Sequence, residues 1–406
     1  MVFMIKKIFY GWWIVLACFI ISLYMASVVF FGFTAFFEPL IREFGWSYAQ
    51  VSFAASLRGM EMGIFAPLVG LLADRFGSRK IILCGVITVG FGLGLLSFTR
   101  SLAMFYGSIL LLAFGAGGCS SVVTMSAVAN WFKRDVGKAL GVMSCGFGAS
   151  GLLIPVIVWL MEFYTWRTAL IILAFGMLVL GIPLSLVIRN KPEQYGYRAD
   201  GAMAVDIPIE EKTQYENTKI GFKEFLRERD FLYLSLAESI RMMTVAAVVV
   251  HVMPYLSSVG VSRSTAGMVA AGIPLFSIMG RFGFGWLGDL FDKRYMMAVV
   301  YCFMGAGMVA FIFGQSGWMI FFFLLLFPPG FGGSMVLRGA ILREYFGRAS
   351  FGKMIGMLLG IASIGGIIGP TLAGWAFDCL GSYYYIWFAF AGCVSISVMV
   401  ILRIKS

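Results

Sequence analysis

Long apolar runs alternate with short polar breaks along the whole chain. Each run holds roughly 20 to 28 residues, about the number that an α-helix needs to cross the hydrocarbon core of a bilayer. The pattern therefore predicts twelve transmembrane helices. They are expected near residues 11–36, 47–72, 80–98, 103–131, 137–161, 166–188, 230–256, 262–288, 293–314, 318–341, 350–377 and 382–403.

One longer polar segment divides this pattern into two halves. An offset of 215 residues relates the halves, with nine identities that include Pro39 with Pro254 and Asp74 with Asp289. Parallel repeats of this kind are typical of transporter folds, which place a cavity between the repeats. We expect an all-α membrane fold of two pseudo-symmetric six-helix bundles. The predicted parts are an N-terminal bundle at 1–188, a cytoplasmic central loop at 189–229 and a C-terminal bundle at 230–406.

Composition and charge agree with insertion into a membrane. Apolar residues make up 60% of the chain and charged residues 13%, against about 25% in soluble domains. Of the 31 basic residues, 23 fall in segments on the side of the N-terminus, which predicts that both termini are cytoplasmic. We expect a multi-pass protein of the cell membrane without a cleaved signal sequence. The net charge of +11 is dispersed and does not indicate nucleic-acid binding.

The sequence lacks the motifs of an enzyme. Its seven Cys are scattered without a CxxC pair, its single His has no metal-ligand partners in the pattern, and no Walker motif is found. The segment GFGASG at 146–151 matches a dinucleotide fingerprint, but it lies inside a predicted helix with no preceding strand, so we interpret it as helix packing and bending. We expect no catalytic residues, no cofactor and no metal.

The strongest local motif is GLLADRFGSRK at 70–80, with a weaker copy, GWLGDLFDKR, at 285–294. Gly70 permits close helix contact, Asp74 can cap a neighbouring helix, and Arg75 favours a cytoplasmic turn. This pair of motifs resembles the signature of the major facilitator superfamily, whose transporters alternate between inward-open and outward-open states. The resemblance implies that Gly70, Asp74, Arg75, Gly285 and Asp289 form a cytoplasmic latch.

Five further segments resemble the monocarboxylate and oxalate/formate carriers of that superfamily. In those carriers an arginine in helix eight binds the substrate carboxylate, which implies this role for Arg281. The chain departs from the animal-type carriers at Ser277, where they have an Asp, and from the oxalate type at Lys353, which lies at the start of helix eleven. The segments are YGWW at 10–13, NWFKRDVGKALG at 130–141, RNKPEQYGYRADG at 189–201, HVMPYLSSVGVS at 251–262 and REYFGRASFGKMIG at 343–356.

The residues themselves also single out Arg281. It lies eight positions before Asp289, roughly 12 Å along a helix and so near the middle of the membrane. A cation there is costly unless it is paired or hydrated, and a guanidinium is suited to holding a carboxylate with two hydrogen bonds. Its repeat counterpart is Ala66, so the charge is not needed twice to build the fold. The alternative is a structural ion pair with a buried glutamate.

Other intramembrane charges allow two interpretations each. Arg58 with Glu61, and Glu238 with Arg241, are spaced i, i+3 and can neutralise one another, or one of the glutamates can carry a coupling proton. Arg338 is either a second anion contact or the partner of Glu238. A second cation facing the cavity would favour a dicarboxylate or a phosphorylated anion.

Several weaker candidates for the substrate path carry polar or hydroxyl groups. His251 is either an interfacial histidine bonded to backbone or a pH-dependent gate. The small and hydroxyl residues of the predicted fourth helix serve either a polar path or helix packing. The remaining candidates are Cys119, Ser120, Tyr24 and Ser363.

These patterns together predict a secondary active transporter of a small organic anion, a mono- or dicarboxylate, by alternating access. Proton symport is favoured over anion exchange. The expected partners are the anion, the lipid bilayer and protons, with no nucleic acid, and the protein is expected to be a monomer. The alternatives are efflux of an amphipathic, drug-like compound by proton antiport and a non-transporting membrane sensor.

Overall fold

The fold consists of apolar helices. Within the residues that the structure describes, every regular element is helical, and eleven segments are long and apolar enough to cross a membrane. The remaining predicted span, 47–72, begins as a helix and continues into residues outside the described part. The prediction of an all-α membrane fold is confirmed. The computed structural model describes residues 9–57, 69, 72–73, 75–132, 136–190, 192–195, 228–346 and 351–404.

In the described N-terminal half, two helices begin at side chains that cap them. Ser101 and Thr165 each accept a hydrogen bond from the backbone N–H three residues on, which satisfies a donor that the helix itself leaves free. The α-helices are α1 (Tyr10–Met25), α2 (Phe33–Phe44), α3 (Tyr48–Leu57), α5 (Ser78–Ser97), α6 (Leu102–Gly118), α7 (Ser121–Ala129), α8 (Val136–Ala149), α9 (Ile154–Phe163) and α10 (Trp166–Val187). The shorter elements are the π-helix η1 (Ala26–Phe31) and the 3-10 helices η3 (Ser150–Leu153) and η4 (Pro192–Tyr195).

In the C-terminal half the helices are longer and less interrupted. Ser262 and Asp292 cap two of them through their side-chain oxygens. The helices are α12 (Arg229–Ser258), α13 (Arg263–Leu290), α14 (Lys293–Ile312), α15 (Gly317–Phe346), α16 (Phe351–Leu380) and α17 (Tyr384–Ile401).

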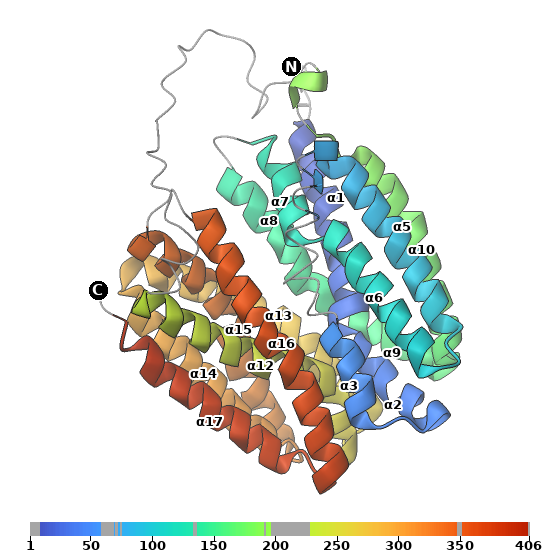
Figure 1. The fold of residues 1–406 in the computed structure, drawn as a ribbon, viewed down its shortest axis with the longest axis vertical. Coiled ribbons are helices and arrows are strands. Elements are labelled where there is room, and N and C mark those ends of the chain that lie inside the picture. The colour runs from blue at the N-terminus through green and yellow to red at the C-terminus, as the bar shows by residue number, and fades with distance from the viewer. Residues whose placement is uncertain are drawn as a thin grey trace, which may run out of the picture.

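The two halves lie side by side as two bundles, one coloured blue to green and the other yellow to red (Figure 1). In the first bundle α5 packs on α6 and α10; in the second α12 packs on α16, and α15 packs on both α13 and α14. Gly45 and Gly260, which the 215-residue offset pairs, both have positive φ angles, 66° and 86°. Glycine adopts this backbone without strain, so each half closes the corresponding helix end with glycine.

Both ends of the described chain lie at one end of the bundle. There, the Tyr10 hydroxyl at the start of α1 donates to the carbonyl oxygen of Val187 at the end of α10 (2.8 Å). Arg294, at the start of α14, donates to the carbonyl oxygen of Ile404 (2.9 Å). The predicted domain boundaries at 188/189 and 229/230 stay predictions, because residues 196–227 lie outside the described part.

At the end of the bundle that carries neither terminus, hydrogen bonds join the two halves; we call these contacts the seam. Asp378 in α16 accepts hydrogen bonds from the backbone N–H groups of Tyr48 (3.0 Å) and Ala49 (2.8 Å), at the start of α3. Arg263 in α13 donates to the carbonyl oxygen of Ala35 in α2 (2.9 Å). A carboxylate at a helix N-terminus is favoured by the helix dipole, so the Asp378 contact is attractive in charge as well as in geometry.

The glycines of segment 146–151 allow close helix approach. A Cβ on Gly146 would meet the backbone oxygen of Phe19 in α1, and one on Gly151 would meet that of Ala271 in α13. The chain there changes from α8 through the 3-10 turn η3 to α9. The segment thus serves helix packing and bending, as its position in an apolar run predicts.

Candidate functional site

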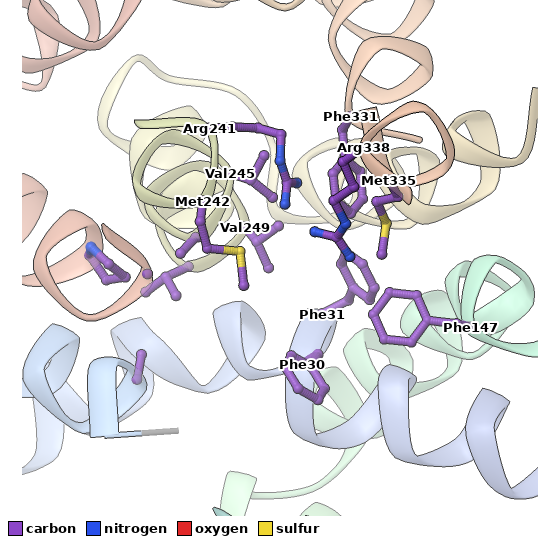
Figure 2. Close-up of a pocket in the computed structure, with 15 residues that line it drawn as sticks. Phe30, Phe31, Phe147, Arg241, Met242, Val245, Val249, Phe331, Met335 and Arg338 are labelled. Atoms are coloured by element: carbon purple, nitrogen blue, oxygen red, sulfur yellow. The ribbon is translucent and has the colours of Figure 1, made fainter. Parts of the chain in front are cut away.

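A cavity with a volume of about 140 Å³ lies between the two halves (Figure 2). Its walls come from η1, α3 and α8 of the first half and from α12, α15 and α16 of the second. Among the described residues, the lining is apolar except for two guanidinium groups. The residues are Phe30, Phe31, Ala55, Phe147, Arg241, Met242, Val245, Ala246, Val249, Val250, Phe331, Met335, Arg338, Gly366 and Pro370.

A π-helical segment forms the aromatic wall of this cavity. In η1 the backbone N–H of Gly32 donates to the carbonyl oxygen of Ser27, five residues earlier (2.7 Å). The extra residue in the turn changes the side-chain register, and the consecutive residues Phe30 and Phe31 both line the cavity. Both contact the ring of Phe147 in α8, at centroid distances of 5.9 and 5.5 Å.

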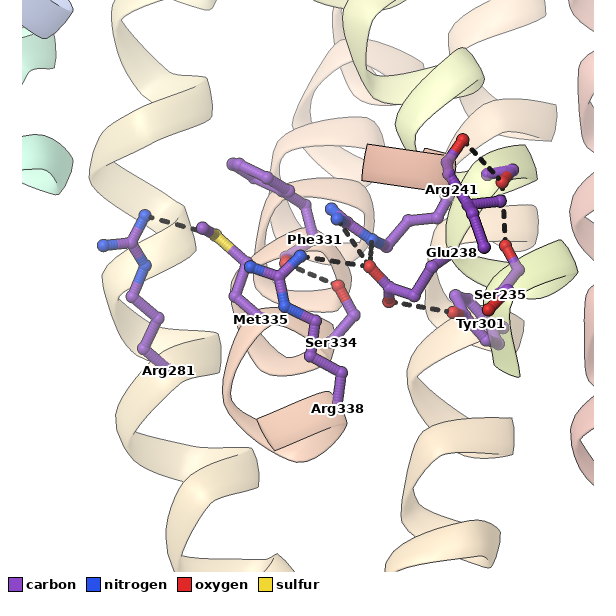
Figure 3. A network of polar contacts seen from close by, with 11 residues as sticks. Ser235, Glu238, Arg241, Arg281, Tyr301, Phe331, Ser334, Met335 and Arg338 are labelled. Carbon is purple, nitrogen blue, oxygen red and sulfur yellow. Dashed lines mark hydrogen bonds and ion pairs between the residues drawn. The ribbon is translucent and has the colours of Figure 1, made fainter. Parts of the chain in front are cut away.

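A buried carboxylate organises the polar wall (Figure 3). Glu238 in α12 accepts hydrogen bonds from Nε of Arg241 (2.9 Å) and from Nη1 of Arg338 in α15 (3.1 Å). The Tyr301 hydroxyl in α14 donates to its other oxygen (3.2 Å). Glu238 is fully buried and Arg241 is 2% exposed, so this network joins three helices without access to bulk solvent.

The charges of this network do not cancel. One carboxylate, Glu238, faces two guanidiniums, which leaves a net charge of +1 at the cavity wall. Nη1 of Arg241 and Nε of Arg338 have no hydrogen-bond partner. Uncompensated donors in a low-dielectric setting attract an anion strongly, because the cost of burying the guanidiniums has already been incurred in the folded protein. Arg338 thus pairs with Glu238 and also lines the cavity, and its contact with an anion stays a prediction.

Arg281 lies in α13, behind two residues of the cavity wall. Its Nη2 contacts the sulfur of Met335 (3.7 Å), and its guanidinium lies 5.5 Å from the ring centre of Phe147. Its Nη1 donates to the carbonyl oxygen of Ser144 in α8 (3.3 Å), and its Nε has no partner. No carboxylate within the described residues bonds to Arg281, and Figure 3 shows it on the opposite side of Met335 from Arg338. It is thus adjacent to the cavity without lining it.

His251 is fully buried and takes part in the seam. Its Nε2 lies 2.9 Å from the carbonyl oxygen of Pro370 and 3.0 Å from the Ser52 hydroxyl, and its Nδ1 lies 2.9 Å from the Tyr383 hydroxyl. A carbonyl only accepts, so Nε2 carries the proton and the Tyr383 hydroxyl donates to Nδ1. His251 therefore has its partners in the packed interior and does not line the cavity, although its neighbour Val250 does.

The four weaker candidates lie away from the cavity. The Tyr24 hydroxyl donates to the carbonyl oxygen of Leu173 inside the first half (2.7 Å). Cys119 is buried against the carbonyl oxygen of Ile82, and Ser363 bonds to the carbonyl oxygen of Gly360 on its own helix. Ser120 lies in the short break between α6 and α7, directly before the first residue of α7. None of these four residues lines the cavity in this conformation, and their place on the substrate path stays a prediction.

The predicted latch and the second-helix pair fall largely outside the described residues. Arg75 is exposed and stacks on the neighbouring ring of Phe76 (5.5 Å), and Gly285 lies in α13 close to Val336. The roles of these residues stay predictions. Those outside the described part are Arg58, Glu61, Gly70, Asp74 and the side chain of Asp289.

Sequence reasoning missed the aromatic wall and one polar residue, Tyr301. Phe30, Phe31, Phe147 and Phe331 are apolar residues in apolar runs and carry no distinguishing signal. Tyr301 is likewise one of 16 tyrosines. The signal that could have identified Tyr301 as a partner of Glu238 is its position at the same depth in the membrane.

Two repeated helical bundles with a charged cavity at their interface define a membrane transporter. The profile of the Major Facilitator Superfamily matches residues 12–257 and 234–405. The chain therefore belongs to the Major Facilitator Superfamily and is a multi-pass secondary transporter, not an enzyme.

Comparison with known proteins identifies a relative by sequence and two solved structures with the same fold. Monocarboxylate transporter 13 from Bos taurus is 25% identical over 377 residues, which cover 92% of this chain and 84% of that protein. The crystal structure of a bacterial homologue of the human lysosomal transporter Spinster, inward-facing and unoccupied, gives a TM-score of 0.73 at 18% identity, covering 98% of this chain and 95% of that chain. A mutant of the nucleoside transporter NupG gives 0.76 at 11%, covering 98% and 100%. The structures show the shared fold, and the predicted relationship to monocarboxylate carriers is confirmed as distant homology.

Proposed function

We propose that this transporter carries a small organic anion, a carboxylate, whose charged group binds at Arg338, with Arg281 as the neighbouring cation behind Met335. The observation that supports this most is the sharing of one carboxylate, Glu238, between two guanidiniums at the cavity wall. A substrate carboxylate there neutralises the remaining positive charge. At an effective dielectric constant of about 20, opposite unit charges about 4 Å apart attract by about 4 kcal/mol.

Glu238 also offers a route for coupling to protons. A proton taken up by Glu238 after the anion has bound removes the charge of this carboxylate and frees Arg338 to hold the substrate with its full set of donors. One anion and one proton then enter together, and the net charge of the site stays unchanged. This balance favours symport over anion exchange. Glu61, outside the described residues, is the other candidate carrier.

In the proposed orientation the protein lies in the cytoplasmic membrane with both termini in the cytoplasm. The excess of basic residues on that side supports it. The seam then lies on the outer face, so the conformation is closed to the outside. In alternating access, the contacts of Asp378 and Arg263 break as the outer side opens.

Uptake into proteoliposomes tests the proposal. A panel of radiolabelled carboxylates is offered with and without an inward-directed proton gradient. Saturable uptake of at least one carboxylate, increased by the gradient, is expected. If no carboxylate is taken up, the anion assignment is wrong. If Glu238→Gln and Glu61→Gln both keep pH-driven accumulation, neither residue carries the proton.

Efflux of an amphipathic compound is the second candidate function. The apolar lining of the cavity favours it, because such a surface also accepts uncharged aromatic compounds. The two functions differ in charge: an efflux carrier of this kind exchanges a neutral or cationic compound for protons. If neutral amphiphiles inhibit uptake and carboxylates do not, the result favours efflux.

A further inference from the structure

The walls of the cavity constrain the uncharged body of the substrate as well as its charged group. Apart from the guanidiniums, the lining side chains are phenylalanine, methionine, valine, alanine, glycine and proline. The carbonyl oxygen of Pro370 is already bonded to His251. Beyond the two guanidiniums, the described side chains of the lining therefore offer no hydrogen-bond partner to a hydroxyl or a second carboxyl group on the substrate body, and burying such a group unpaired is unfavourable.

The volume sets the size of this body. The cavity measures about 140 Å³. An apolar protein cavity of about 150 Å³ takes one benzene molecule. The rings of Phe30, Phe31 and Phe147 meet at steep angles, 62° and 68°, and so offer edges and faces to a further ring. One ring, aromatic or saturated, fills this space, whereas a two-ring body exceeds it.

With Glu238 ionised, the charges of the described lining residues match a single negative charge on the substrate. Glu238 neutralises one of the two guanidiniums that line the cavity, Arg241 or Arg338, and leaves one positive charge for the ligand. A second carboxylate would meet the apolar wall formed by Phe331 and the valines. The ammonium group of an amino acid would be repelled by the guanidiniums. Dianions and zwitterions are both disfavoured.

We propose that the favoured substrate is a monocarboxylate whose apolar body is about the size of one ring, with phenylacetate as the probe. This inference rests on the proposed function and names the substrate class of the same site. Phe147 then determines specificity, because it lines the cavity and contacts both phenylalanines of η1 as well as the guanidinium of Arg281.

The test compares half-saturation concentrations in proteoliposomes for phenylacetate, acetate, lactate, succinate and the amino acid phenylalanine. Phenylacetate is expected to saturate at a concentration at least about tenfold lower than acetate, since apolar pockets discriminate by roughly 10- to 200-fold per missing methylene. Equal or tighter saturation by lactate or succinate overturns this inference and leaves the proposed anion carriage standing. Failure of every carboxylate overturns both.

A matched pair of variants separates specificity from stability. Phe147→Ala is expected to lower the preference for phenylacetate over acetate by at least about tenfold, with acetate uptake itself less affected. Phe175→Ala, on the outer surface of α10 at 66% exposure, is expected to keep the wild-type preference. The ratio between two substrates does not depend on how much folded protein is present. An unchanged ratio in Phe147→Ala contradicts the proposal.

Discussion

Replacing Arg338 with glutamine removes the unbalanced charge of the cavity while keeping Glu238 paired. Glu238 retains two contacts from Arg241, at 2.9 Å from Nε and 2.8 Å from Nη2, and one from the Tyr301 hydroxyl at 3.2 Å. The net charge of the wall changes from +1 to zero. Removing one partner of a buried charge pair costs about 2–5 kcal/mol in binding. Desolvation of the substrate carboxylate offsets part of its attraction, so we expect about 2–3 kcal/mol, or roughly 30- to 140-fold weaker binding.

Titration calorimetry on protein in nanodiscs measures this loss, with thermal unfolding as a check of folding. Arg338→Lys restores the charge without the planar guanidinium and is expected to bind with intermediate affinity. Arg42→Gln is the matched control, because the Arg42 side chain is 80% exposed and lies in α2 near the seam. Wild-type carboxylate affinity in folded Arg338→Gln protein would refute the charge argument.

Three further predictions concern other parts of the molecule. Arg281→Lys leaves the protein folded but sharply reduces anion uptake, since one ammonium cannot reproduce the guanidinium contacts; normal uptake removes this role. Asp378→Asn weakens the charged cap on α3 by about 0.3–1 kcal/mol. Distances between paired spin labels across the seam should therefore show a two- to fivefold larger open population. An unchanged distance distribution counts against this prediction. In the loop before α14, the hydrogen bond from Arg294 lowers the pKa of the Asp292 carboxyl. The ionised carboxyl therefore stabilises the folded protein above the ordinary pKa of Asp, and this stabilisation is lost as pH falls through the lowered pKa. The melting temperatures of wild type and Asp292→Asn should therefore differ at pH 7 and converge at acidic pH; a constant difference would contradict this.

The spans and the two-half architecture could be predicted from sequence because membrane insertion forces long apolar runs and the repeat keeps residues at equivalent bends. The glycines at 45 and 260 illustrate this, since a left-handed helix end requires the same residue type in each half. The i, i+3 pairing of Glu238 with Arg241 was also predictable, because helix geometry alone brings such residues together.

Contacts between helices could not be predicted in the same way. The pairing of Arg338 with Glu238 spans 100 residues and depends on how α12 and α15 pack. The aromatic wall depends on the π-helical turn of η1, whose register no apolar pattern specifies. His251 was a candidate for the substrate path, whereas its partners depend on how three helices pack against α12: Ser52 lies in α3, Pro370 in α16 and Tyr383 directly before α17.

A structure of the protein with phenylacetate bound, determined by electron cryomicroscopy in nanodiscs, tests the central claim most directly. The account predicts the carboxylate within hydrogen-bond distance of the Arg338 guanidinium and the ring against Phe31 and Phe147. A carboxylate bound elsewhere, with the guanidiniums of Arg241 and Arg338 contacting Glu238 alone, would contradict it.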